Sequence, residues 1–184
     1  MSDLNEKCLD TFSAWLRSLG DDIEALLAVA EIEAVGADVR KHLVAGINYI
    51  FKSLDLIPDG IDDIGYLDDA FVLRVVSSLV QESDLSAAGA DKVAAIASLA
   101  EQTALIREFL EDPTYVRLVN YTKNLGNSMA RGRTVDSILS DPEVWNAFVT
   151  EVRAFAKNYE CPSFSREERN LIKLRAFFDA KLPK

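Results

Sequence analysis

L-D-D-A-F-V-L-R-V-V-S-S-L-V-Q, residues 67 to 81, is the stretch that decides the fold. Wound at 3.6 residues per turn, this stretch has apolar side chains on every side, and Arg74 is the only charge after its first turn. A helix that is apolar all round is normally buried, so we expect this one at the centre of the molecule. The segment 38–53 is also nearly apolar in its second half. The two segments are therefore predicted to pack as a central helical hairpin.

Helical patterns flank this hairpin on both sides. Apolar residues at three- and four-residue steps predict one helix ending at Gly20 and a second from Asp21 to Gly36, and an alanine-rich helix follows over 91–111. The matching segments 110–113 and 139–142 each place Asp before Pro, which is typical of a helix start. Ser165 and Glu168 have the spacing of a capping box before a last helix. These patterns predict an all-α bundle of about eight or nine helices.

Length and composition suggest a single helical domain over residues 1–184, with a C-terminal helical extension over about 112–184. The apolar fraction is 49%, and 8 Gly and 5 Pro leave little material for a loop-rich β fold. The formal charge of −10 disfavours binding to nucleic acid, whose phosphates would be repelled. The first residues do not resemble a signal peptide, and no apolar run is long enough to cross a bilayer. We therefore expect a cytoplasmic protein without a transmembrane segment.

An acidic segment connects the two helices of the hairpin. Residues 54–69 read L-D-L-I-P-D-G-I-D-D-I-G-Y-L-D-D, and no basic residue lies between Lys52 and Arg74. Two carboxylates about 4 Å apart repel by roughly 4 kcal/mol at an effective dielectric constant of 20, so this clustering needs compensation. Alternating apolar residues indicate that the segment packs on the core. Helix N-termini, basic residues from elsewhere in the chain, or a bound divalent cation could each supply the compensation.

Two interpretations of the acidic segment remain open. Asp68 and Asp69 fall at a helix start, where carboxylates meet free backbone N–H groups, and this interpretation is purely structural. Alternatively, Asp55, Asp59, Asp68 and Asp69 provide the hard oxygen ligands that Mg²⁺, Mn²⁺ or Ca²⁺ prefers. Their spacing does not match the EF-hand calcium loop. A docking surface for a basic protein partner is a further alternative.

The residues around this turn resemble a known family. Tyr49, the segment 54–59 and the segment 65–69, with the pattern D-x-I-P-D followed by G-x-x-D-D, look like the bacterial YkvA-like family, also called domain of unknown function 1232. The resemblance covers about residues 43–80 and implies an apolar helix, an acidic turn and a second apolar helix. The family has no settled activity. The resemblance therefore implies only which residues to test: Asp55, Pro58, Asp59, Gly65, Asp68 and Asp69.

A basic stretch is the second unusual feature. Residues 114–135 contain Arg117, Lys123, Arg131 and Arg133 and no acid. Backbone N–H groups and the side chains of Lys123, Arg131 and Arg133 could bind an anion there, although the P-loop pattern is absent. An exposed loop between helices, or a loop paired with the acidic turn, would explain the same composition.

These observations support three hypotheses of function. The leading one is a non-enzymatic binding module that uses the acidic turn as structure or as a recognition surface for a protein partner. The alternative is a divalent-metal-dependent phosphate-handling or hydrolytic enzyme, in which the aspartates hold the ion. A third is reversible membrane attachment through the apolar hairpin. The apolar face of the last helix is expected to fold back on the domain or to form a homodimer contact.

Overall fold

The computed structural model describes residues 3–52, 55–58, 60–61 and 63–184 and confirms an all-α bundle. Its α-helices are α1 (Asp3–Ala30), α2 (Ala37–Tyr49), α3 (Leu67–Val80), α4 (Ala90–Glu101), α5 (Thr103–Lys123), α6 (Val135–Ser140), α7 (Pro142–Asn158) and α8 (Glu168–Lys181). Short 3-10 turns, η1 (Glu33–Val35), η2 (Ser86–Ala88) and η3 (Asn124–Asn127), connect some of them. Two-residue strands β1 (Met129–Ala130) and β2 (Arg133–Thr134) form a small antiparallel hairpin before α6.

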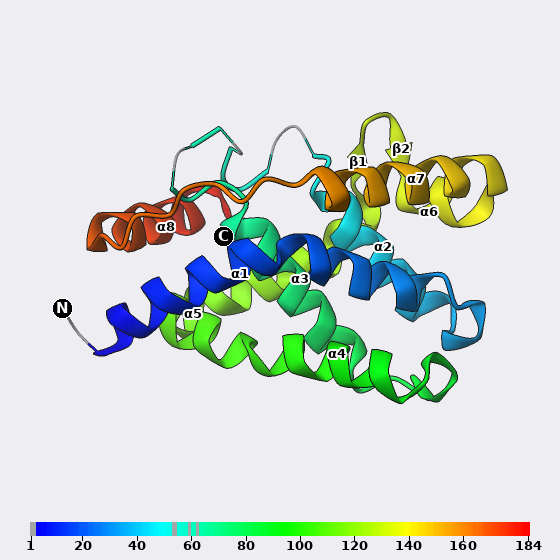
Figure 1. Cartoon of the computed structure of the whole chain (residues 1–184), viewed down its shortest axis with the longest axis horizontal. Helices are drawn as coiled ribbons and strands as arrows, with labels where there is room; N and C mark the ends of the chain where they lie inside the picture. The colour runs from blue at the N-terminus through cyan, green and yellow to red at the C-terminus, as the bar shows by residue number, and fades with distance from the viewer. Residues whose placement is uncertain (1–2, 53–54, 59, 62) are drawn as a thin grey trace.

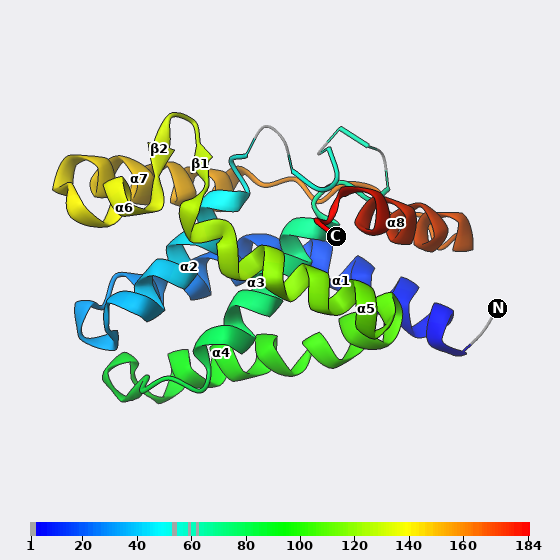
Figure 2. The same ribbon diagram turned by 180° about the vertical axis from the view of Figure 1, so that it is seen from behind.

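Helix α3 lies at the centre of the bundle, as its composition predicts. It packs against α1, α2, α4 and α5, and Figures 1 and 2 show it enclosed between them. Phe71 is fully buried, and its ring packs edge-on against the rings of Phe12, Trp15 and Phe109. The hairpin of α2 and α3 therefore supplies much of the core.

The predicted helix boundary at Gly20 is wrong, because α1 continues through it without a break. A Cβ added at Gly20 would lie 3.0 Å from the carbonyl oxygen of Ala156 in α7. Glycine at this position therefore allows α1 and α7 to approach closely, whereas the sequence pattern suggested that it ends a helix. The two predicted N-terminal helices are consequently one.

Other helix ends differ in part from the expectation. The predicted helix over 91–111 is interrupted after Glu101, and α5 bends at Glu111, which has a positive φ of 62°. Asp141 caps α7 as predicted, because its carboxylate accepts hydrogen bonds from the N–H groups of Glu143 and Val144. The predicted capping box at Ser165 does not form. Helix α8 begins at Glu168 without a side-chain cap.

Helix α8 folds back on the domain, which was one of the two expectations for it. It packs against α1 and α5 through its buried residues Leu171, Leu174 and Phe178. The ring of Phe178 stacks on that of Phe71, with ring centroids 5.2 Å apart. The helix is reached from α7 by an extended segment that runs across the bundle (Figure 1).

Candidate site at the acidic turn

The acidic turn is fastened to the hairpin by a buried carboxylate, that of Asp68. This residue lies in the first turn of α3 and is 0% exposed. Its Oδ2 atom accepts a hydrogen bond of 2.5 Å from the hydroxyl of Tyr49, at the end of α2, and another of 3.1 Å from the backbone N–H of Ile57. The Tyr49 hydroxyl in turn accepts the backbone N–H of Leu56 at 2.8 Å. One carboxylate and one phenol therefore join both helices to the turn.

Burial controls the electrostatics of this pair. Burial, helped by the nearby charge of Asp55, raises the pKa of Asp68 to about 7, against the opposing effect of the hydrogen bonds from the Tyr49 hydroxyl and the Ile57 N–H. The pKa of the Tyr49 hydroxyl is raised strongly, first by burial and then by the carboxylates of Asp68 and Asp69. The phenol therefore remains protonated and acts as a donor to Asp68. Within the described residues, the second carboxylate oxygen of Asp68 is buried without a hydrogen-bond partner.

A cation lies beside the same phenol. The ammonium group of Lys52 donates a hydrogen bond of 2.9 Å to the hydroxyl of Tyr121 in α5, and it lies over the rings of both Tyr121 and Tyr49. These two rings meet edge-to-face, with centroids 6.1 Å apart. Cation–π contacts of this kind hold an ammonium group without a carboxylate partner. Lys52 thus offsets part of the negative charge of the turn.

The remaining predicted site residues have different environments. Asp69 is buried. Asp55 is only partly buried, and this burial raises the pKa of the Asp55 carboxyl group. Pro58 is exposed and its carbonyl accepts the N–H of Ile61, while the N–H of buried Gly65 donates to the Ile61 carbonyl. The prediction for Asp59 lies outside the described residues.

Asp63, to which no family role was assigned, joins the turn to the C-terminal region by hydrogen bonds. Its carboxylate accepts hydrogen bonds from the backbone N–H and the hydroxyl of Ser165, at 3.1 and 3.2 Å. This contact explains why Ser165 does not cap α8. Asp63 also has a positive φ of 73°, a conformation that Asp tolerates better than most residues.

Metal ligation has limited support in this geometry. In the ranges 3–52, 55–58, 60–61 and 63–184, no group of three or more His, Cys, Asp or Glu side chains could hold an ion. Asp55 and Asp68 are close enough for their charges to interact, but one oxygen of Asp68 is already committed to two donors.

Among the residues that the structure describes, no helix is sufficiently long and apolar to cross a membrane.

The predicted anion-binding residues do not converge on an open site. Arg131 and Arg133 both pair with Glu151 of α7, and both guanidinium groups lie over the ring of Phe51. Lys123 is exposed at the end of α5. Arg131 and Arg133 are therefore paired with a glutamate distant in sequence. Pairing of this stretch with the acidic turn had been one of the alternatives.

A second buried polar cluster was not predicted as a site. Arg74, on α3, is 1% exposed and forms an ion pair of 3.0 Å with Asp22 of α1. Its Nε donates to the Gln102 side chain, its Nη1 donates to the Ala70 carbonyl, and its guanidinium lies 4.1 Å from the ring centroid of Trp15. Burial lowers the pKa of Arg74 to about 10 and raises that of Asp22. The signal in the sequence was the single charge in an otherwise apolar helix.

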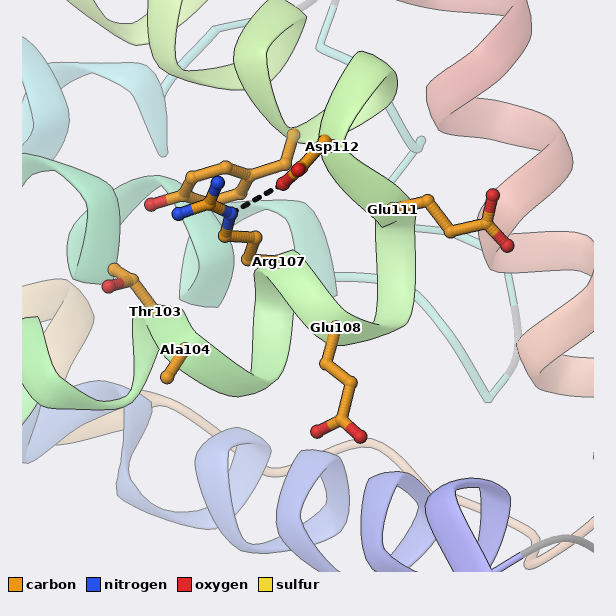
Figure 3. Close-up of a pocket in the computed structure, with 7 residues that line it drawn as sticks. Thr103, Ala104, Arg107, Glu108, Glu111 and Asp112 are labelled. Carbon is orange, nitrogen blue, oxygen red and sulfur yellow. Dashed lines mark hydrogen bonds and ion pairs between the residues drawn. The ribbon is translucent and has the colours of Figure 1, made fainter.

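A recess of about 610 Å³ lies at the bend of α5 and is open to solvent. Arg107 and Asp112 form an ion pair of 2.5 Å across this bend, and Figure 3 shows Glu108 and Glu111 directed away from that pair. Both members of the pair are more than 60% exposed. Exposed ion pairs contribute little stability, so we interpret this recess as a consequence of the bend.

Comparison of the chain with models of known protein families, with curated proteins and with solved structures finds no match. The YkvA-like resemblance therefore rests on the residue pattern within about 43–80 alone.

Proposed function

We propose that this chain is a cytoplasmic, non-enzymatic helical module of the YkvA-like type, and that it uses the acidic turn to bind a basic segment of a protein partner. The observation that carries the proposal is the commitment of Asp68 and Asp63 to hydrogen bonds within the fold. Asp68 Oδ2 holds the Tyr49 hydroxyl and the Ile57 N–H, and both oxygens of Asp63 hold Ser165, so these three oxygens are engaged within the fold. A fixed loop on a rigid scaffold is typical of a recognition surface.

Exposure within the turn defines where the partner would bind. Pro58 and Gly60 are exposed, and Asp55 is partly exposed beside them. Of the two nearest basic residues in the sequence, Arg74 is paired with Asp22, and Lys52 offsets only part of the charge of the six aspartates in residues 54–69. The surface of the turn is therefore negative, which favours a lysine- or arginine-rich segment through steering and rim ion pairs.

A labelled lysine- and arginine-rich peptide of about twelve residues tests this proposal by fluorescence anisotropy, with an acidic peptide as the reference. We expect the basic peptide to bind, binding to weaken as salt is added, and Asp55→Asn to weaken it severalfold. Asp91→Asn, which removes an exposed carboxylate at the start of α4, is the matched control and should leave binding unchanged. An equal loss in both variants would indicate a response to net charge and would contradict the proposal.

The alternative function is a divalent-metal site for phosphate handling or hydrolysis. Two observations favour it: the second oxygen of Asp68 is buried without a hydrogen-bond partner in the described residues, and Asp55 lies close enough to influence that carboxylate. A cation between these groups would lower the electrostatic cost of burying them. This alternative also requires Asp59.

Thermal unfolding of metal-stripped protein with Mg²⁺, Mn²⁺ or Ca²⁺ separates the two functions. An ion at one hundred times its dissociation constant adds about 2.7 kcal/mol of stability, which corresponds to roughly 5 to 10 °C for a chain of this size. We expect no such shift at millimolar ion. A shift of that size that disappears in Asp68→Asn would support the metal-dependent enzyme and contradict the interaction module.

A further inference from the structure

The polar cluster around Arg74 lies at the base of a groove between α1 and α4. The groove has a volume of about 450 Å³, within the range of small-molecule sites, and Trp15, Asp22, Arg74, Leu99 and Gln102 contribute to its lining. Small side chains on both helices, Ala14, Ala25, Ala95 and Ser98, form its walls and hold it open. It is separate from the acidic turn, because its residues come from α1, from the middle of α3 and from the end of α4.

Arg74 organises this base but is itself sealed from solvent. Its Nε and Nη2 atoms donate to Gln102 Oε1 at 2.7 Å and to Asp22 Oδ2 at 3.0 Å. Because Nε and Nη2 are neighbouring donors of one planar guanidinium group, they hold the two acceptor side chains next to each other. Trp15 covers the guanidinium at 4.1 Å and keeps its position fixed.

This arrangement leaves one acceptor and one donor available in the groove. Both hydrogen bonds to Asp22, from Ser18 and from Arg74, end on Oδ2, and Asp22 Oδ1 receives none from the described part of the chain. Gln102 uses its Oε1 for Arg74, and its amide nitrogen donates to no residue in the described ranges. Asp22 and Gln102 both line the groove, so a carboxylate oxygen and an amide NH₂ group of the same groove wall are left without a partner among the described residues.

The charges at the base determine which ligand is compatible. Asp22 and Arg74 neutralise each other, so an added anion would face Asp22 and an added cation would face the guanidinium, without a net attraction for either. An uncharged group that carries an N–H donor beside a C=O acceptor matches both free positions. A primary carboxamide or a lactam has this pattern, and its apolar body would contact the alanine walls and Leu99.

We propose that the groove between α1 and α4 binds a small uncharged molecule through a carboxamide- or lactam-like edge, which donates to Asp22 Oδ1 and accepts from the amide of Gln102. Arg74 is then a positioning residue, since it holds both contact groups and does not touch the ligand. Binding sites that pair donors with acceptors in this way discriminate strongly against analogues that lack one of the two groups.

Four probes with the same ring and different edges test this proposal: benzamide, benzoate, benzylamine and acetophenone. Binding is followed by protein NMR through the side-chain signals of Trp15 and Gln102. We expect benzamide to give saturable shifts and the other three to bind at least about tenfold more weakly, because each lacks a donor, lacks an acceptor or adds a charge. Stronger binding of benzylamine or benzoate than of benzamide would overturn the proposal.

Variants determine whether the shifts arise in the groove. Ala95→Leu fills one wall with a good helix former, and Gln102→Glu replaces the donor by an acceptor while keeping the bond to Arg74. Both should abolish benzamide binding in a folded protein. Gln81→Glu makes the same chemical change at an exposed position at the end of α3 and should leave benzamide binding unchanged. Unchanged binding in folded Ala95→Leu, or no saturable shift in the unmodified protein at millimolar benzamide, would contradict the proposal.

Discussion

Asp68 and Arg74 are two buried charged residues on the same helix, and the protein compensates them differently. Asp68 receives two neutral hydrogen-bond donors and no direct ion-pair partner among the described residues. Arg74 has a carboxylate, an amide, a carbonyl and an indole ring around it. A neutral environment favours the protonated form of a carboxyl group, whereas the ion pair keeps both of its members charged.

The stability of the protein should therefore depend on the protonation of Asp68. Its pKa is about 7 in the native state and about 3.9 in an unfolded chain, so the folded state binds this proton more tightly. The contribution to the free energy of unfolding is fully present below pH 4 and is lost as the pH rises to about 7. Asp68→Asn keeps a neutral acceptor for Tyr49 and should remove this dependence.

Urea denaturation between pH 4 and 8 measures this effect as the difference between the two proteins. We expect the free energy of unfolding of the unmodified protein to fall by roughly 2 to 4 kcal/mol relative to that of Asp68→Asn over this range. The exposed Asp91→Asn is the control. Parallel pH profiles for the unmodified protein and Asp68→Asn would show that Asp68 titrates normally.

The Arg74 cluster should respond strongly to loss of one partner and weakly to loss of both. Arg74→Met leaves Asp22 as an uncompensated, largely buried carboxylate, and we expect a loss of about 3 to 5 kcal/mol of stability. Adding Asp22→Leu should recover most of that loss, because two apolar side chains need no charge compensation. A double-mutant cycle measured by urea denaturation checks this coupling, and additive losses would contradict it.

At the level of elements, the hairpin depends on a close contact between its two helices. A Cβ added at Gly46 of α2 would lie 2.7 Å from Cγ2 of Val76 in α3. Real Cβ atoms are almost never so close, so α2 and α3 could not keep their present separation with a larger residue at this position.

Gly46→Ala should therefore destabilise the protein despite the better helix propensity of alanine. We expect a loss of about 1 to 3 kcal/mol from overpacking, measured by thermal or urea unfolding. Combining it with Val76→Ala removes the clash and should give a protein more stable than the sum of the two single changes predicts. An increase in stability for Gly46→Ala alone would show that the helices separate easily.

At the level of the whole molecule, the C-terminal helix completes the core. Phe178 is fully buried and stacks on Phe71, which belongs to the central helix. Asp63 and Ser165 make a second connection between the acidic turn and the segment that leads into α8. Residues of the predicted C-terminal extension thus pack on the hairpin and hold part of its turn.

Truncating Phe178 should lower the stability of the entire domain. We expect Phe178→Ala to reduce the free energy of unfolding by about 3 to 5 kcal/mol, whereas Phe177→Ala, at a partly exposed position of the same helix, should cost much less. A single cooperative urea transition monitored by tryptophan fluorescence and by circular dichroism checks this expectation. Separate transitions for the two probes would instead indicate that α8 unfolds independently.

The sequence by itself determined the all-α class, the central hairpin and the N-cap at Asp141. These features follow from apolar periodicity and from local hydrogen bonding, both of which act over a few residues. Only the tertiary structure decided that Gly20 lies within a continuous helix, that Ser165 binds Asp63, and that Glu151 pairs with Arg131 and Arg133. The groove between α1 and α4 was also decided by the tertiary structure, because Asp22, Arg74 and Gln102 meet there from three parts of the chain. Contacts between residues far apart in the chain depend on how the helices pack, and no local pattern encodes them.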